Sequence, residues 1–227
     1  MPPLTEQAHA IIRLVVRPSD VAIDATAGNG HDTKFLADLV GETGQVFAID
    51  VQQEALQQTA TLLGEAALAR VHLLHRDHAE LKAFIPEQDH GRIAAVMFNL
   101  GYLPGGNRSL ATQMDSTLKA IRSALEILQP GGILTVISYP GHPSGVDESI
   151  AVESLMRNLS PADYETAKHS AASERAFVPC LFVVTKPVSQ VSNTSGLEEC
   201  DNNGCPPNKS LEESLDGERD ANQNETR

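Results

Sequence analysis

The sequence predicts an α/β protein in which a parallel sheet is covered by helices on both faces. Short, fully apolar runs of the kind found in buried strands alternate along the chain with longer segments of helical periodicity. Strands that are apolar on both faces must be buried on both faces, and in a parallel sheet helices provide that cover. With 227 residues, 41% of them hydrophobic, the chain is long enough for one domain with a sizeable core.

The order of the elements follows from these patterns. We expect strands at the apolar runs 21–27, 45–50, 71–75, 93–100, 132–139 and 177–185, with a poorer one at 164–170. We expect helices between them, at 32–40, 52–67, 78–84, 109–128 and 146–159. Helix 109–128 is the clearest, because apolar residues recur there at three- and four-residue steps until Gln129-Pro130-Gly131-Gly132 ends it.

The C-terminal stretch differs from the rest of the chain. Residues 188–227 hold nine acidic and three basic residues, so −6 of the formal net charge of −13 lies there. The stretch is rich in Ser, Asn, Gly and Glu and has few large apolar side chains, so it cannot bury enough surface to offset its ordering entropy. We therefore expect a folded domain at 1–187 and an acidic disordered tail at 188–227.

Composition disfavours several classes of protein. No apolar stretch approaches the roughly 18 residues that span a bilayer, so no membrane partner is expected. The N-terminus lacks the basic and then apolar pattern of a signal peptide. Three cysteines are too few, and an odd number, for a disulfide framework, and the pair Cys200 and Cys205 is a weak metal signal. We expect no metal and a reducing, cytoplasmic setting.

The stretch DATAGNGHDT, residues 24–33, follows the first expected strand. Gly28 and Gly30 let the chain turn tightly and approach a ligand closely, and Asn29 between them offers an amide. Asp50 ends the next strand 20 residues after Gly30, a spacing at which dinucleotide-binding folds hold a ribose through a carboxylate. The turn therefore indicates a nucleotide-like cofactor.

The same stretch argues against a phosphate on that cofactor. Thr33 stands where the dinucleotide fingerprint has its third glycine, and no Lys-Ser or Lys-Thr pair follows the glycines. A tight turn with no ligand is the alternative. A turn without a ligand would not explain why Asp24, Asp32 and Asp50 cluster at one edge of the sheet, so we favour a ligand.

Polar residues also follow the third, fourth and fifth strands, at the edge where parallel sheets bind ligands. Asp77 or His78 could face an adenine, or Asp77 could simply cap a helix that starts at His78. Asn99 begins the stretch NLGYLPGG, for which a plain loop is the alternative. Tyr139 and His142 lie in the stretch SYPGH at the same edge.

Four motifs form a specific set: DATAGNGHDTKFLA, VFAIDVQQEAL, MFNLGYLPGGNRS and YPGHPSGVDE. Together they resemble the class I S-adenosylmethionine-dependent methyltransferases of the putative rRNA methylase family, members of which are associated with methylating the aminomethyl group of wobble 5-aminomethyl-2-thiouridine in tRNA. The resemblance covers roughly residues 5–187. It implies a Rossmann-like, mostly parallel seven-stranded sheet whose last strand, 177–185, is antiparallel.

The resemblance also implies which residues hold the cofactor, namely Asn29, Asp32, Asp50, Gln52 and His78. The chemistry of these side chains agrees with S-adenosylmethionine, which has a ribose and an adenine, no phosphate, and positive charges on its amino group and sulfur. The chain departs from the family where AASERAFVPC replaces an asparagine-rich segment before the final strand.

A primary amine as methyl acceptor sets requirements that Asn99, Tyr139 and His142 could meet. The side-chain oxygen of Asn99 could accept the N–H bonds of the amine and so orient its lone pair, which is a positioning effect. Tyr139 or His142 could take the proton, and a histidine is better matched to neutral pH. The alternative for His142 is that it only caps a loop.

Three classes of function stay open. The first is methylation of the wobble nucleoside in the anticodon region of tRNA, the second is methylation of rRNA or of a small-molecule amine, and the third is a non-catalytic binding module. An acidic chain is a poor first candidate for binding nucleic acid, but a local basic patch would suffice. The basic residues that could surround the catalytic end are Arg108, Lys119, Arg122, Arg157 and Arg175, for which ordinary surface is the alternative. A homodimer also stays open.

Overall fold

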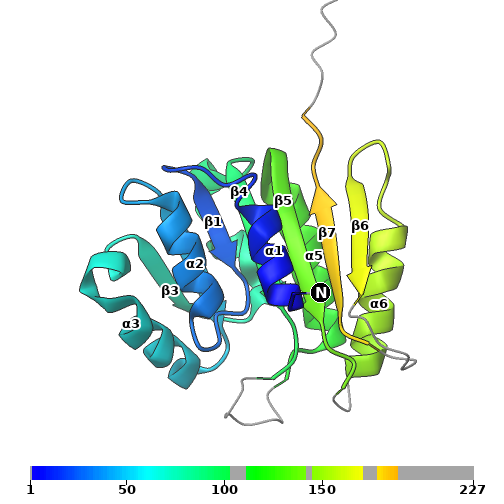
Figure 1. Cartoon of the computed structure of the whole chain (residues 1–227), viewed down its shortest axis with the longest axis horizontal. Coiled ribbons are helices and arrows are strands. Elements are labelled where there is room, and N and C mark those ends of the chain that lie inside the picture. The colour runs from blue at the N-terminus through cyan, green and yellow to red at the C-terminus, as the bar shows by residue number, and fades with distance from the viewer. Residues whose placement is uncertain (1, 103–110, 142–144, 171–177, 189–227) are drawn as a thin grey trace, which may run out of the picture. The chain divides into compact units, whose positions relative to one another are not determined.

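Figure 1 shows the protein as a computed structural model. The structure describes residues 2–102, 111–141, 145–170 and 178–188. The chain divides into two units, Met1–Gln190 and Val191–Arg227, and the second unit lies outside the described residues. The folded domain at 1–187 and the disordered tail therefore stay predictions.

Within the described residues, seven strands form one sheet in the order β3-β2-β1-β4-β5-β7-β6 (Figure 1). The strands are β1 (Val21–Asp24), β2 (Gln45–Asp50), β3 (Val71–His75), β4 (Ile93–Asn99), β5 (Leu128–Ser138), β6 (Glu165–Ser170) and β7 (Cys180–Thr185). The strands β1 to β5 pair in parallel with one another, whereas β7 pairs antiparallel with both β5 and β6. The mostly parallel sheet with an antiparallel last strand is confirmed, including the poorer strand signal at 164–170.

Helices cover both faces of the sheet. They are α1 (Leu4–Ile12), α2 (His31–Val40), α3 (Gln53–Leu68), α4 (Leu81–Phe84), α5 (Met114–Ile127) and α6 (Gly145–Arg157), with short 3₁₀ turns at His78–Glu80 and Glu87–Asp89. One core cluster joins one face of the sheet to α1, α2 and α3, and a second joins the other face to α4, α5 and α6. Figure 1 shows α1 in front of the sheet and α5 behind it.

Two expectations about helices were wrong. Helix α1 was not predicted, although Leu4, Ala8 and Ile12 are spaced four residues apart and are all buried against the sheet. Helix α5 begins at Met114, whereas the periodicity put its start at residue 109. Residues 111–113 have no helical backbone, and Gln113 is the extended N-cap residue of α5.

Candidate active site

Parallel strands bring the predicted polar residues to one edge of the sheet. Strand β1 ends at Asp24 and β2 ends at Asp50, while β4 ends at Asn99 opposite Ile137 of β5. Tyr139 follows β5 directly. The carboxyl edge of the sheet is therefore where the glycine turn, the acidic residues and Asn99 meet, as ligand binding in such folds requires.

The glycine turn connects β1 to α2. Gly28 has φ 52° and Gly30 has φ 84°, both in the left-handed region that favours glycine. A Cβ atom on Gly30 would lie 2.8 Å from the backbone Cα of Thr59 in α3, and the Thr59 hydroxyl donates to the Gly28 carbonyl oxygen at 3.1 Å. Gly30 thus has a structural role that sequence reasoning missed, because it lets the turn press against α3. Asn29 lies between the glycines and is half-buried.

Asp50 is held in place by the chain around it. One carboxylate oxygen accepts the N–H of Gly28 at 2.9 Å, and the other accepts the N–H of Gln52 at 2.8 Å. Gln52 is buried and precedes the first turn of α3. Each oxygen of a carboxylate can accept more than one hydrogen bond, so Asp50 retains the capacity to bind ribose hydroxyls while the two backbone bonds fix its orientation.

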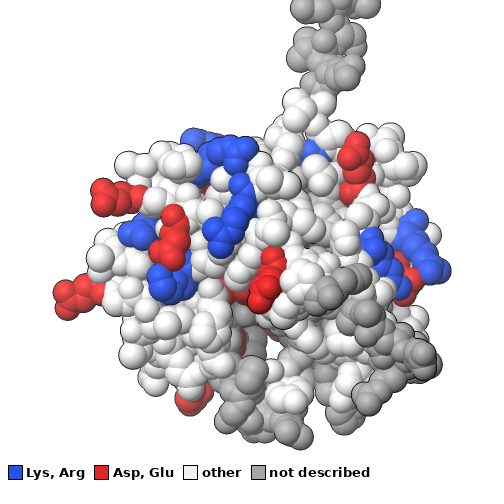
Figure 2. All heavy atoms as spheres, viewed as in Figure 1, with Lys and Arg blue, Asp and Glu red and all other residues white. Residues whose placement is uncertain are grey.

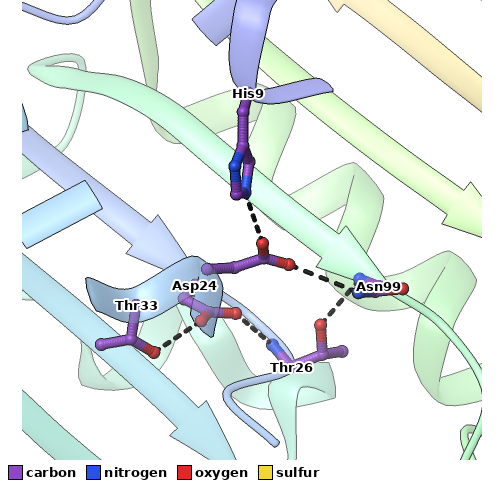
Figure 3. Close-up of polar contacts among 6 residues, drawn as sticks. His9, Asp24, Thr26, Thr33 and Asn99 are labelled. Atoms are coloured by element: carbon purple, nitrogen blue, oxygen red, sulfur yellow. Dashed lines mark hydrogen bonds and ion pairs between the residues drawn. The ribbon is translucent and has the colours of Figure 1, made fainter. Parts of the chain in front are cut away.

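Asp32 lies at the centre of a polar network that includes an unpredicted residue. Its Oδ1 is 2.6 Å from Nε2 of His9 in α1, and its Oδ2 accepts the Asn99 side-chain amide at 3.4 Å (Figure 3). The His9 ring stacks on Phe35, with 3.7 Å between ring centroids and 4° between planes. Sequence reasoning missed His9 because it missed α1, and the spacing of Leu4, Ala8 and Ile12 is the signal that could have found it.

Asp24 is fully buried beneath this network. It accepts the Thr33 hydroxyl at 2.6 Å and the Thr26 backbone N–H at 3.1 Å (Figure 3). Burial and then the nearby charge of Asp32 raise the pKa of Asp24 to about 7. The Thr26 hydroxyl in turn accepts the backbone N–H of Asn99 at 2.7 Å, so the turn after β1 is tied to the end of β4.

Asp77 and His78 lie two to three residues beyond the end of β3. His78 is buried, with Nδ1 3.1 Å from the Ala25 carbonyl oxygen. Asp77 accepts the Ala79 N–H at 2.9 Å and the Ser116 hydroxyl at 2.5 Å. Partial burial acts to raise the pKa of Asp77, but these hydrogen bonds outweigh it and hold the pKa below its ordinary value. Asp77 thus does cap the turn at His78, and a role of either residue toward adenine stays a prediction.

Tyr139 is close enough to Asp32 for the charge of that carboxylate to affect the pKa of the phenol. Burial and then the negative charge of Asp32 raise the pKa of Tyr139 above its ordinary value. This shift favours the protonated phenol, which can donate or accept a hydrogen bond, and the role of Tyr139 as a base stays a prediction. His142, Arg108 and Arg175 lie outside the described residues.

The loop between β4 and α5 is fastened at both of its described ends. The Gly101 N–H donates to the Thr112 hydroxyl oxygen at 3.0 Å, and Thr112 donates to Glu148 of α6 at 2.8 Å. The Thr117 hydroxyl donates to the other oxygen of Glu148 at 2.7 Å. Glu148 is buried, so a single carboxylate joins α5, α6 and the chain that follows Asn99.

The described surface is mixed in charge. Lys119 and Arg122 are exposed on α5, whereas Arg157 pairs with Glu153. Figure 2 shows Lys and Arg side chains interspersed with Asp and Glu on the face that carries α1. Within the described ranges, no group of three or more His, Cys, Asp or Glu residues could hold a metal ion. No helix in that part of the chain is long and apolar enough to cross a membrane.

A seven-stranded sheet with β7 antiparallel, and a glycine turn beside carboxylates at its carboxyl edge, define a class I methyltransferase fold and site. The chain belongs to the family described as putative rRNA methylase, whose model matches residues 46–185. This confirms the resemblance carried by the four sequence motifs and identifies the chain as an S-adenosylmethionine-dependent methyltransferase.

Three relatives show how far the similarity extends. A protein of Arabidopsis thaliana described as a chloroplastic tRNA (mnm(5)s(2)U34)-methyltransferase is 38% identical over 191 residues, which cover 80% of this chain and 69% of that protein. A structure described as a putative rRNA-methylase from Clostridium thermocellum is 34% identical with a TM-score of 0.77, covering 82% of this chain and 98% of that one. A putative methyltransferase from Streptococcus mutans, solved in complex with SAH, is 33% identical with a TM-score of 0.72, covering 82% and 99%.

Proposed function

We propose that this protein transfers a methyl group from S-adenosylmethionine to the aminomethyl nitrogen of 5-aminomethyl-2-thiouridine at the wobble position of tRNA. The similarity to the Arabidopsis protein, which covers 80% of this chain, supports this substrate. The observation that carries the proposal is the geometry of Asn99. Its amide nitrogen donates to Asp32, so the oxygen of the same amide is the atom that we assign to accept an N–H of the amine.

The donor set fits the cofactor. S-Adenosylmethionine, when bound, supplies a methyl group on a positively charged sulfur, and the acceptor nitrogen takes this methyl with its lone pair and then loses a proton. Asp50, held by Gly28 and Gln52, is the group we assign to the ribose hydroxyls. Carboxylates and amides suit a cation that carries no phosphate. We assign His78, Asp77 and Asn29 to the same cofactor.

Asn99 and Tyr139 act on the acceptor in this proposal. The Asn99 oxygen orients the amine, and positioning of this kind can supply several kcal/mol of a barrier. Burial and then the charge of Asp32 raise the pKa of Tyr139 above its ordinary value, so we assign Tyr139 a hydrogen bond to the acceptor and regard His142 as better matched to the proton at neutral pH. We therefore assign the proton to His142 in SYPGH.

The nucleic acid and the cellular setting are further parts of the proposal. Lys119 and Arg122 are exposed on α5, beside the turn at His78, and are the described basic residues we assign to RNA phosphates. A reducing compartment is supported by Cys180, which is buried as a free thiol. The Arabidopsis relative is described as chloroplastic, so the cytoplasmic location and the homodimer stay predictions.

The test offers the purified protein three classes of acceptor together with methyl-labelled S-adenosylmethionine. These are tRNA whose wobble uridine carries the unmethylated aminomethyl group, rRNA, and a small primary amine. We expect label in the tRNA, its loss with Asn99→Ala and its retention with Asn158→Ala, a matched asparagine exposed at the end of α6. Label in rRNA or in the small amine would favour the second class of function, and no label in any acceptor would favour a binding module.

A further inference from the structure

We propose that His9 is a positioning residue of the cofactor site, which fixes the Asp32 carboxylate so that it receives the positively charged amino group of the cofactor. The inference rests on the proposed cofactor site but not on the identity of the methyl acceptor. His9 lies in α1, outside the segment 46–185 that the family model matches. Helix α1 therefore completes the site in addition to covering the sheet.

The His9 ring is fixed at two points. Its plane lies against Phe35, with 3.7 Å between centroids and 4° between planes, and its Nε2 is 2.6 Å from Oδ1 of Asp32. An ionised carboxylate accepts hydrogen bonds and cannot donate them. The histidine nitrogen that faces it must therefore carry the hydrogen. His9 thus donates to Asp32 in a short hydrogen bond with a charged acceptor.

Asp32 needs this donor because it is buried beside another acid. The side chains of Asp32 and His9 are 9% and 23% exposed, and the negative charge of Asp32 is close enough to raise the pKa of Asp24. The other hydrogen bond to Asp32, from Asn99, is longer at 3.4 Å. Without His9 the carboxylate would lose its shorter hydrogen bond, and repulsion from Asp24 would favour another rotamer.

The assignment of Asp32 to the cofactor amino group follows from what the neighbouring acids do. Asp24 is fully buried and accepts from Thr33 and Thr26. Asp50 is held by backbone N–H groups where the ribose is expected. Asp77 accepts from Ala79 and Ser116, so Asp32, in the first turn of α2, is the carboxylate that we assign to the amino group. His9 uses its Nε2 on Asp32, so it acts through Asp32 and not on the reacting atoms.

The test compares two amide replacements that differ only in reach. The amide nitrogen of glutamine can occupy the place of Nε2, whereas that of asparagine falls short of it. S-Adenosylhomocysteine keeps the amino group and the ribose, so its affinity measured by calorimetry reports on the site without any methyl acceptor. We expect His9→Ala and His9→Asn to weaken binding by about tenfold or more, and His9→Gln to stay within about threefold of the unchanged protein.

Two controls separate positioning from general damage. His72 stacks on Phe47 with 4.8 Å between centroids, far along the sheet from Asp32, and His72→Ala should leave the affinity unchanged. In an Asp32→Asn background, His9→Ala should cause little further loss, because both changes remove the same interaction. Equal affinity in all His9 variants, or equal loss in His9→Gln and His9→Asn at unchanged melting temperature, would overturn the proposal. A full additional loss in the Asp32→Asn background would overturn it as well.

Discussion

Replacing Asp24 with asparagine should make the protein more stable at alkaline pH. Asp24 is fully buried, and burial together with the charge of Asp32 raises its pKa from 3.8 to about 7. The folded state therefore binds a proton that the unfolded state has already released. Stability from this group is fully present below pH 3.8 and is lost as pH rises toward about 7, beyond which the loss is constant.

The size of the effect follows from the shift. A difference of about 3 pKa units corresponds to roughly 4 kcal/mol, of which about 2–3 kcal/mol falls between pH 5 and 7. Asp77 and Glu153 have pKa values held below their ordinary ones, so they contribute stability that is lost only at lower pH. Groups common to both proteins cancel in the difference between Asp24→Asn and the unchanged protein, so this difference from pH 5 to 8 reports on Asp24. The asparagine amide has nearly the shape of the protonated carboxyl, so Asp24→Asn removes the titration with little change in packing.

The assay is urea unfolding of the cofactor-free protein at fixed pH values from 5 to 8. Circular dichroism is the suitable probe because the chain has no tryptophan. Relative to the unchanged protein, Asp24→Asn should gain about 2–3 kcal/mol of unfolding free energy as pH rises across this range. Asp38→Asn, at an exposed carboxylate paired with Lys34, is the matched control and should show no such trend. Parallel pH profiles for Asp24→Asn and the unchanged protein would refute the reasoning.

Three further predictions concern Asp50 at the ribose site, Gly30 in the turn after β1, and Glu148, which joins α5 and α6. Asp50→Ala should weaken S-adenosylmethionine binding by at least about tenfold in a folded protein, and unchanged affinity by calorimetry would remove Asp50 from the site. Gly30→Ala should cost roughly 2–4 kcal/mol, because a positive φ and a Cβ contact of 2.8 Å both oppose it. Gly64 also has a positive φ, but a Cβ atom there would meet open space, so Gly64→Ala should cost only about 1–2 kcal/mol. Equal urea midpoints for Gly30→Ala and Gly64→Ala would contradict the role of the Thr59 contact. Glu148→Ala should cost roughly 2–4 kcal/mol, because it leaves two threonine hydroxyls without their acceptor, and a melting curve that overlays the unchanged protein would contradict it.

Most of the sheet could be predicted because its strands are marked by local patterns. Apolar runs bounded by polar residues mark the parallel strands, and this signal can be read without knowing which strands pair with each other. Even β6, whose residues are all exposed, keeps the strand pattern that was read as poorer. Helix α1 was missed because it is short and its buried stripe includes Ala8, a weak hydrophobic signal.

The site could be predicted in part. The edge of the sheet that gathers Asp50, Asn99 and the glycine turn follows from strand direction alone. Three features could not be read locally, because each depends on a contact between distant segments. The hydrogen bond from His9 to Asp32 connects α1 to α2. Glycine is required at position 30 because Thr59 of α3 leaves no room for a Cβ atom. The raised pKa of Asp24 depends on complete burial, which only the fold creates.

The most direct measurement is nucleoside mass spectrometry of tRNA treated with this protein and S-adenosylmethionine that carries a deuterated methyl group. The tRNA is isolated with 5-aminomethyl-2-thiouridine at the wobble position and is digested to nucleosides after the reaction. We predict that this nucleoside disappears and that 5-methylaminomethyl-2-thiouridine appears with the deuterated methyl on its side-chain nitrogen, and that Asn99→Ala prevents the change. An unchanged wobble nucleoside, with the label on another nucleoside or on none, would contradict the proposed function.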